Sequence, residues 1–135
     1  MKARTMTRLQ ALNLVHGEWQ PAQSGAWGTR HDPADGSELG RYAASGRADA
    51  DAAIAAARRA FDQPGWSQNP RLRQMVMLRW ADRLEARASE LAQLLTQENG
   101  KVIAQSRGEI GGAISEIRYY AGLARYMPGH VFEVE

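Results

Sequence analysis

The longest pattern of hydrophobic positions in the chain lies between residues 69 and 100 and predicts one long amphipathic helix. Apolar residues recur there at alternating steps of four and three, which places them on one helix face. They are Met77, Ala81, Leu84, Ala88, Leu91 and Leu95, with Trp80 widening the stripe. Asn69 suits a helix cap, Pro70 suits the first helical position, and Asn99-Gly100 is typical of a C-terminus. Such a stripe has to be covered by another element.

A shorter amphipathic helix is predicted over residues 46–62. Its apolar positions fall at i, i+3, i+4, i+7 and i+11, which is a helical stripe. They are Ala50, Ala53, Ile54, Ala57 and Phe61. Asp49 and Asp51 lie in the first turns and Arg58-Arg59 near the end, which suits the helix dipole. Because alanine dominates this face, we expect the helix to approach a neighbouring element closely.

A third helical pattern runs over residues 102–127. Its apolar face is formed by Ile103, Ile110, Ile114, Ile117, Ala121 and Ala124. Gly108, Gly111 and Gly112 interrupt the pattern, and each weakens a helix by roughly 1 kcal/mol relative to Ala. We expect these glycines to serve a close helix crossing, with a kink as the alternative. Pro128-Gly129 ends the helix, and residues 131–134 read as the start of a strand.

The N-terminal third of the chain predicts two β-hairpins. Short extended runs at 12–15 and 18–20 flank His16-Gly17, where glycine supplies the positive φ of a tight turn. Two further runs, at 27–30 and 38–43, are separated by a turn rich in Asp, Pro and Gly. Strands this short and polar do not form a stable sheet alone.

Length and composition narrow the possible functions. The 135 residues fit one domain or part of one, and residues 1–11, which carry no clear pattern, are expected to form a mobile tail. The net charge is +2, and basic residues alternate with acidic ones instead of clustering as nucleic-acid binding requires. Without Cys, the chain has no disulfide, thiolate metal site or cysteine nucleophile of its own. No run resembles a secretory signal or a membrane span, so we expect a cytoplasmic protein.

Candidate catalytic or ligand-binding groups are sparse. Gly108–Gly112 lies inside a helical pattern, whereas a phosphate-binding loop needs glycines at a strand-to-helix turn followed by Lys. His16, His31 and His130 are scattered and lack the spacing of metal ligands. His31-Asp32 resembles an oriented base, but no nucleophile accompanies it, and an Asp that caps its own turn is the better interpretation.

Three further features have ordinary structural interpretations. Tyr119-Tyr120 and the four Trp residues could stack on a cofactor, but aromatic residues on helix faces and hairpins usually serve packing. Glu98 could be a cation ligand, but the favoured interpretation is that it is a solvated charge at the end of a helix. Residue chemistry alone therefore indicates strands followed by three amphipathic helices and assigns no function.

The order of several motifs carries more information. The chain resembles the aldehyde dehydrogenase superfamily from residue 12 to its end. The matching stretches are Leu14 to Trp19, like the I-N-G-E-W hairpin; Asp32 to Gly40, like N-P-A-T-G-E-x-L-G; Asp49 to Phe61, like D-V-D-x-A-x-x-A-A-R-x-A-F; Trp66-Ser67; Leu78 to Leu95, like L-x-x-L-A-D-x-L-E-x-R-x-x-E-L-A-x-L; Glu98 to Lys101, like E-x-G-K; and Arg118 to Gly122, like R-Y-Y-A-G. Seven such stretches in the family's order are hard to reach by chance.

The resemblance implies a parent enzyme that oxidises aldehydes to acids with NAD or NADP. In that family a cysteine thiolate attacks the aldehyde, a hydride passes to the nicotinamide, and water assisted by a glutamate releases the acid. Those residues and the cofactor cleft correspond to no position of this chain, so no catalytic, cofactor-binding or metal-ligating residue is assigned in it. The family often holds a monovalent cation, and the corresponding positions here are Glu98 and the carbonyls of Arg30 and His31.

The sequence therefore predicts an α+β fragment, the N-terminal part of an aldehyde-dehydrogenase-like α/β fold of Rossmann type. Its parts are hairpins over 12–45 and helices over 46–62, 69–100 and 102–127. We expect that the gene is truncated or split, or that the chain is a fragment of a longer protein. In each case we expect the chain alone to be inactive as an enzyme. Its partner would be the missing remainder or a full-length relative, and the parent would be a homo-oligomer. The alternative is a stand-alone protein-interaction module that reuses this scaffold.

Overall fold

Both predicted hairpins are present in the computed structural model, which describes residues 9–126, 128 and 129. In the first, β2 (Asn13–Val15) and β3 (Glu18–Gln20) pair antiparallel. His16 has a φ of 55° and Gly17 a φ of 81°, so both central residues of the turn are left-handed. This is the backbone that a two-residue hairpin favours because its twist matches that of the strands. The prediction of a tight turn at this position is confirmed.

The second hairpin belongs to a three-stranded sheet in the order β1-β5-β4. β4 (Trp27–His31) pairs antiparallel with β5 (Glu38–Ala43), and β1 (Leu9–Ala11) pairs parallel with β5. The predicted mobile tail over residues 1–11 is therefore wrong for 9–11, while 1–8 lie outside the described residues. The local sequence pattern does not predict β1, because its partner strand lies far along the chain, with Leu9 opposite Gly40.

The helix predicted over 46–62 is α1 (Arg47–Asp62). Its first turn is fastened by Asp49, whose carboxylate accepts hydrogen bonds from the backbone N–H of Gly46 (2.9 Å) and of Gln23 (2.8 Å). The first bond satisfies a free amide at the start of the helix, and the second ties the helix to the loop after β3. Asp49 is buried although it is charged, because both carboxylate oxygens are hydrogen-bonded.

The face that α1 buries within this chain differs from the predicted one. Ala56 is buried together with Asp49, whereas Ile54 and Phe61 of the predicted stripe are exposed. Among the described residues, no element covers these two larger residues of the predicted stripe. The helix contacts β2, and its larger apolar residues are left uncovered.

The long helix predicted over 69–100 is two helices, α3 (Pro70–Ala86) and α4 (Ala88–Asn99), preceded by the short α2 (Pro64–Ser67). The predicted cap is confirmed, since the side-chain oxygen of Asn69 accepts from the N–H of Leu72 at 3.0 Å. The unbroken helix is wrong at Arg87, whose ψ of 11° takes it out of the helical region. Its N–H donates to the carbonyl of Leu84, three residues back, which ends the i to i−4 ladder.

α5 (Ile103–Leu123) packs along α3 and α4. It ends before the predicted boundary at 127, because the N–H of Tyr126 closes a tight turn on the carbonyl of Leu123. The strand predicted over 131–134 lies outside the described residues. The close crossing predicted for the glycines is wrong among the described residues, because a Cβ built on Gly108, Gly111 or Gly112 meets no atom of theirs within 4 Å.

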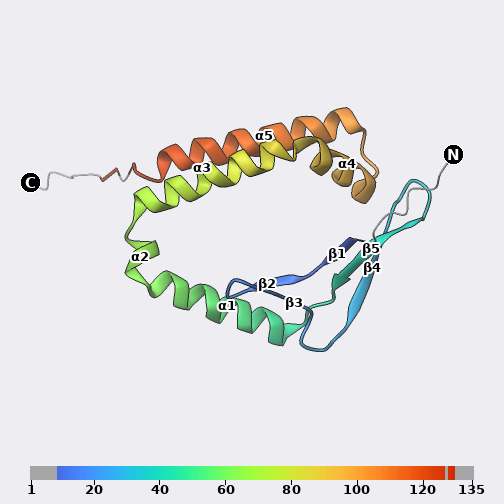
Figure 1. The fold of residues 1–135 in the computed structure, drawn as a ribbon, viewed down its shortest axis with the longest axis horizontal. Helices are drawn as coiled ribbons and strands as arrows, with labels where there is room; N and C mark the ends of the chain where they lie inside the picture. The colour runs from blue at the N-terminus through green and yellow to red at the C-terminus, as the bar shows by residue number, and fades with distance from the viewer. Residues whose placement is uncertain (1–8, 127, 130–135) are drawn as a thin grey trace, which may run out of the picture.

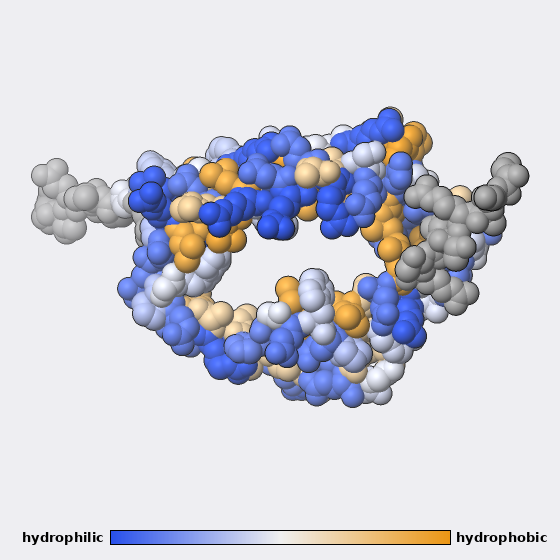
Figure 2. Space-filling model, in the orientation of Figure 1, coloured by the Kyte–Doolittle hydropathy of each residue, from blue (hydrophilic) through white to orange (hydrophobic). Residues whose placement is uncertain are grey.

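The elements form two thin halves. Figure 1 shows α3, α4 and α5 on one side and α1 with the strands on the other, joined by α2 at one end. Figure 2 shows an opening between them. Each half has its own small core: Ala22, Leu39, Ala43 and Ala56 in the strand half, and Ala81, Ala92, Ser106, Ile114 and Ala121 in the helical half. Small residues dominate both cores, and of the larger apolar side chains only Leu39 and Ile114 are buried among the described residues.

Candidate functional site

The described residues do not assemble a cluster of metal ligands. Within residues 9–126, no group of three or more His, Asp or Glu side chains is placed to hold a metal ion. His16 is exposed in the first hairpin turn, and His31 is exposed at the end of β4. His130 lies outside the described part of the chain. The Asp32 carboxylate accepts from the N–H of Ala34 at 2.8 Å, which confirms its role in capping its own turn.

One place where distant segments meet is the junction between the β4–β5 hairpin and the end of α4. The guanidinium of Arg30 donates a hydrogen bond to the backbone carbonyl of Glu98. A pocket of about 200 Å³ opens beside this contact. Its lining consists of Leu9, Ala11, Arg30, Leu39, Gly40, Arg41, Tyr42 and Glu98.

This junction contains the positions that correspond to the family's cation site. The resemblance implies that the backbone carbonyl of Arg30 lies near Glu98. The structure does bring Arg30 to Glu98, but the group that makes the contact is the Arg30 side chain. A guanidinium carries a permanent positive charge, and here it occupies the negative end of the α4 dipole. In the described structure the Glu98 carbonyl is therefore paired with the Arg30 side chain.

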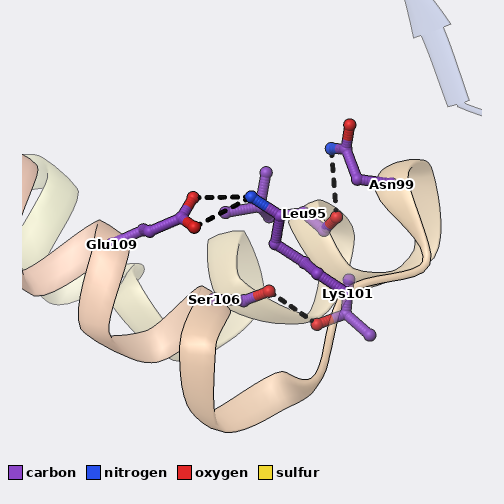
Figure 3. A network of polar contacts seen from close by, with 6 residues as sticks. Leu95, Asn99, Lys101, Ser106 and Glu109 are labelled. Carbon is purple, nitrogen blue, oxygen red and sulfur yellow. Dashed lines mark hydrogen bonds and ion pairs between the residues drawn. The ribbon is translucent and has the colours of Figure 1, made fainter.

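Polar contacts join α4, and the segment that follows it, to the first half of α5 (Figure 3). Gly100 has a φ of 70° and caps α4 in the left-handed conformation. The Lys101 ammonium lies 2.9 and 2.8 Å from the two carboxylate oxygens of Glu109. The hydroxyls of Thr96 and Ser106 are 2.8 Å apart, and Ser106 is fully buried. The Glu98 to Lys101 motif is thus a structural corner.

Arg118, from the R-Y-Y-A-G stretch, joins α5 to α3. Its guanidinium lies 2.6 Å from a carboxylate oxygen of Glu85 and 3.1 Å from one of Asp82. Hydrogen bonding from Arg118, followed by its charge, lowers the pKa of the Glu85 carboxyl below its ordinary value. The same pairing raises the pKa of Arg118. This motif therefore also serves helix packing.

The aromatic pair on α5 points away from the core. Tyr119 and Tyr120 are both exposed, and their rings meet edge to face with centroids 5.3 Å apart. Trp19, Trp66 and Trp80 are also exposed, while Trp27 stacks against the guanidinium of Arg41 at 4.2 Å. The prediction that aromatic residues serve packing is confirmed for Trp27 alone among these, within the described chain.

The remaining candidate for a functional role is the set of exposed apolar side chains. Large hydrophobic side chains are exposed on α1 and α3, among them Ile54, Phe61, Leu72, Val76 and Trp80. Sequence reasoning identified the α1 residues as apolar but not as uncovered, because periodicity shows that a face is apolar without showing what covers it. No helix among residues 9–126 has the length and hydropathy of a membrane span.

Known proteins are similar to this chain in sequence and in fold. The model of the aldehyde dehydrogenase family matches residues 19–135. The putative aldehyde dehydrogenase DhaS of Bacillus subtilis (strain 168) is 39% identical over 122 residues, which cover 89% of this chain and 25% of the relative. The D-glyceraldehyde dehydrogenase (NADP(+)) of Thermoplasma acidophilum is 34% identical over 122 residues, or 88% of this chain and 24% of that relative.

A solved structure agrees with these relatives. The NAD-dependent aldehyde dehydrogenase from Sinorhizobium meliloti superposes with a TM-score of 0.87 at 37% identity, over 91% of this chain and 25% of that one. The chain thus spans about a quarter of the length of the proteins it matches. It belongs to the aldehyde dehydrogenase family, and it corresponds to an N-terminal segment of such an enzyme.

Proposed function

We propose that this chain is the N-terminal structural segment of an NAD(P)-dependent aldehyde dehydrogenase, and that alone it neither oxidises aldehydes nor binds the cofactor. The observation that carries the proposal is the absence of Cys from all 135 residues, in a chain that spans a quarter of its relatives. In the parent reaction a cysteine thiolate adds to the aldehyde to form a thiohemiacetal, which then transfers a hydride to NAD or NADP.

The residues of this chain have a scaffolding role in the proposal. The Lys101–Glu109 and Thr96–Ser106 contacts hold the α4–α5 corner, and Arg118 holds α5 against α3. Arg30 fastens the hairpin to the end of α4. The polar motifs that resemble the family are thereby used within the segment, which leaves the apolar faces for the rest of the enzyme.

The test uses the isolated chain with a panel of aldehydes and either NAD or NADP. We expect no formation of reduced cofactor, and no saturable binding in a cofactor titration. A cofactor site is a preformed cleft with several convergent polar groups, and we expect none in the isolated chain. Binding of NAD or NADP with micromolar affinity would therefore contradict the proposal.

A stand-alone protein-interaction module is the second candidate, and the exposed residues of α1 and α3 favour it. The two functions differ in how the isolated chain behaves. A segment that needs the rest of its enzyme should bind an apolar dye and unfold over a broad temperature range. An adapted module should unfold cooperatively, as a monomer or as a defined oligomer.

A further inference from the structure

Two stripes of large apolar side chains are bare in this chain, and they lie on different helices. On α1, Ile54 is 68% exposed and Phe61 is 57% exposed. On α3, Leu72, Val76 and Trp80 recur at steps of four, and Val76 and Trp80 are 42% and 53% exposed. Spacings of seven and of four residues keep side chains on one helix face, so each set is a continuous stripe.

Each stripe lies away from the side through which its helix packs. Ile54 precedes the buried Ala56 by two residues, which is roughly 200° around the helix at ~100° per residue. Val76 precedes the fully buried Ala81 by five residues, which places it roughly 140° away. Neither stripe can therefore be covered by a small rearrangement of the contacts that its helix already makes.

The relatives of this chain indicate what covers the two stripes. The same fold, at a TM-score of 0.87, forms part of a chain of which it is only 25%. Monomeric soluble domains seldom leave large apolar patches bare, and here two helices in different halves each expose large apolar side chains. The opening between the two halves shows further that the described chain does not fill its own interior (Figure 2).

We propose that the α1 stripe (Ile54 and Phe61) and the α3 stripe (Leu72, Val76 and Trp80) are two docking faces for the remaining three quarters of an aldehyde dehydrogenase polypeptide. This assignment rests on the proposed function and adds which surfaces make the contact. The polar flanks of the same helices, including Arg59 and Arg71, stay in water.

The test replaces the matched quarter of the Thermoplasma acidophilum D-glyceraldehyde dehydrogenase with this chain. Stripe variants carry Ile54→Glu with Phe61→Glu, or Val76→Glu with Trp80→Glu. Control variants carry Arg59→Glu or Arg71→Glu, at exposed positions that already hold a charge. The readouts are soluble yield, thermal unfolding and NADP-dependent oxidation of D-glyceraldehyde. The isolated chain with each stripe variant is compared by circular dichroism.

We expect the unaltered chimera to fold and oxidise D-glyceraldehyde, and each stripe variant to lose roughly tenfold or more of the soluble, active enzyme, because a buried carboxylate lacks a partner. The controls should stay within about twofold, since exposed substitutions have small effects. The isolated chain should keep its helix content in every variant.

Three outcomes would overturn the assignment in distinguishable ways. An active chimera whose stripe variants match the controls would refute the docking faces and leave the proposed function standing. Loss of helix in the isolated stripe variants would show that these side chains serve the chain's own fold. A chimera that does not fold even with the unaltered chain would refute the proposed function and the docking faces together.

Discussion

The Thr96–Ser106 contact predicts a measurable weakness at the α4–α5 corner. Ser106 is fully buried, and its hydroxyl lies 2.8 Å from that of Thr96. Ser106→Ala removes one partner and leaves the Thr96 hydroxyl without its hydrogen bond. Such a loss costs about 1 to 2 kcal/mol, which raises the equilibrium for local opening by roughly 5- to 30-fold.

Amide hydrogen exchange measures that local opening directly, and it does so even where the whole chain does not unfold in one step. The informative amides belong to the first turn of α5, where the N–H groups of Gln105 and Ser106 bond to the carbonyl of Val102. Their exchange should accelerate by the stated factor in Ser106→Ala. Amides in β2 and β3 serve as the internal control, because they lie in the other half.

A double variant decides whether the hydrogen bond is the cause. Thr96→Val combined with Ser106→Ala removes both hydroxyls, so no unpaired group is left, and protection should partly return. Unchanged exchange in Ser106→Ala would refute the reasoning. Strictly additive effects in the double variant would show that the two hydroxyls do not interact.

Three further predictions concern the backbone and one buried carboxylate. Gly100→Ala should cost about 1 kcal/mol in the free energy of local opening at the end of α4, because its φ of 70° is strained for a residue with a Cβ. Amide exchange in the last turn of α4 measures the loss. Gly40→Ala should detach β1, because the new Cβ would lie 2.3 Å from the backbone oxygen of Leu9; faster amide exchange in β1 and unchanged exchange in β2 would support this. Hydrogen bonds from Gly46, then Gln23, lower the pKa of Asp49. The carboxylate therefore contributes its full stabilisation at a pH above its pKa in the unfolded chain, about 3.9, and loses it as the pH falls through the lower pKa of the folded chain. The Gln23 amide signal in NMR should shift with pH over this range, and Asp49→Asn should abolish that shift.

Local chemistry explains which elements were predictable from the sequence. The His16-Gly17 turn follows from the positive φ that its hairpin requires, and Asn69 caps α3 through a side chain three residues from its donor. Amphipathic periods located all three helical regions. These features depend on residues within a few positions of one another, so a short stretch of sequence is enough to predict each of them.

The features that could not be predicted depend on distant partners. β1 exists because Leu9–Ala11 meets β5, and Asp49 is buried because the Gln23 amide reaches it across the chain. The break at Arg87 has neither Gly nor Pro beside it to mark it. The glycines of α5 suggested a helix crossing, but no described element approaches them.

The candidate site was predictable in part for the same reason. The motifs around Glu98 and Arg118 identified the family, while their contacts show that they brace the fold. That Ile54 and Phe61 stay bare could not be read from the α1 stripe, because the pattern is the same whether a partner is present or absent.

The central claim is that this chain is an aldehyde dehydrogenase segment that becomes functional only together with the rest of such an enzyme. The most direct measurement compares NADP reduction by D-glyceraldehyde in two samples, the isolated chain and the chimera described above. The account predicts no reduction by the isolated chain and sustained reduction by the chimera. Reduction of NADP by the isolated chain would contradict it, and so would a folded chimera with no activity.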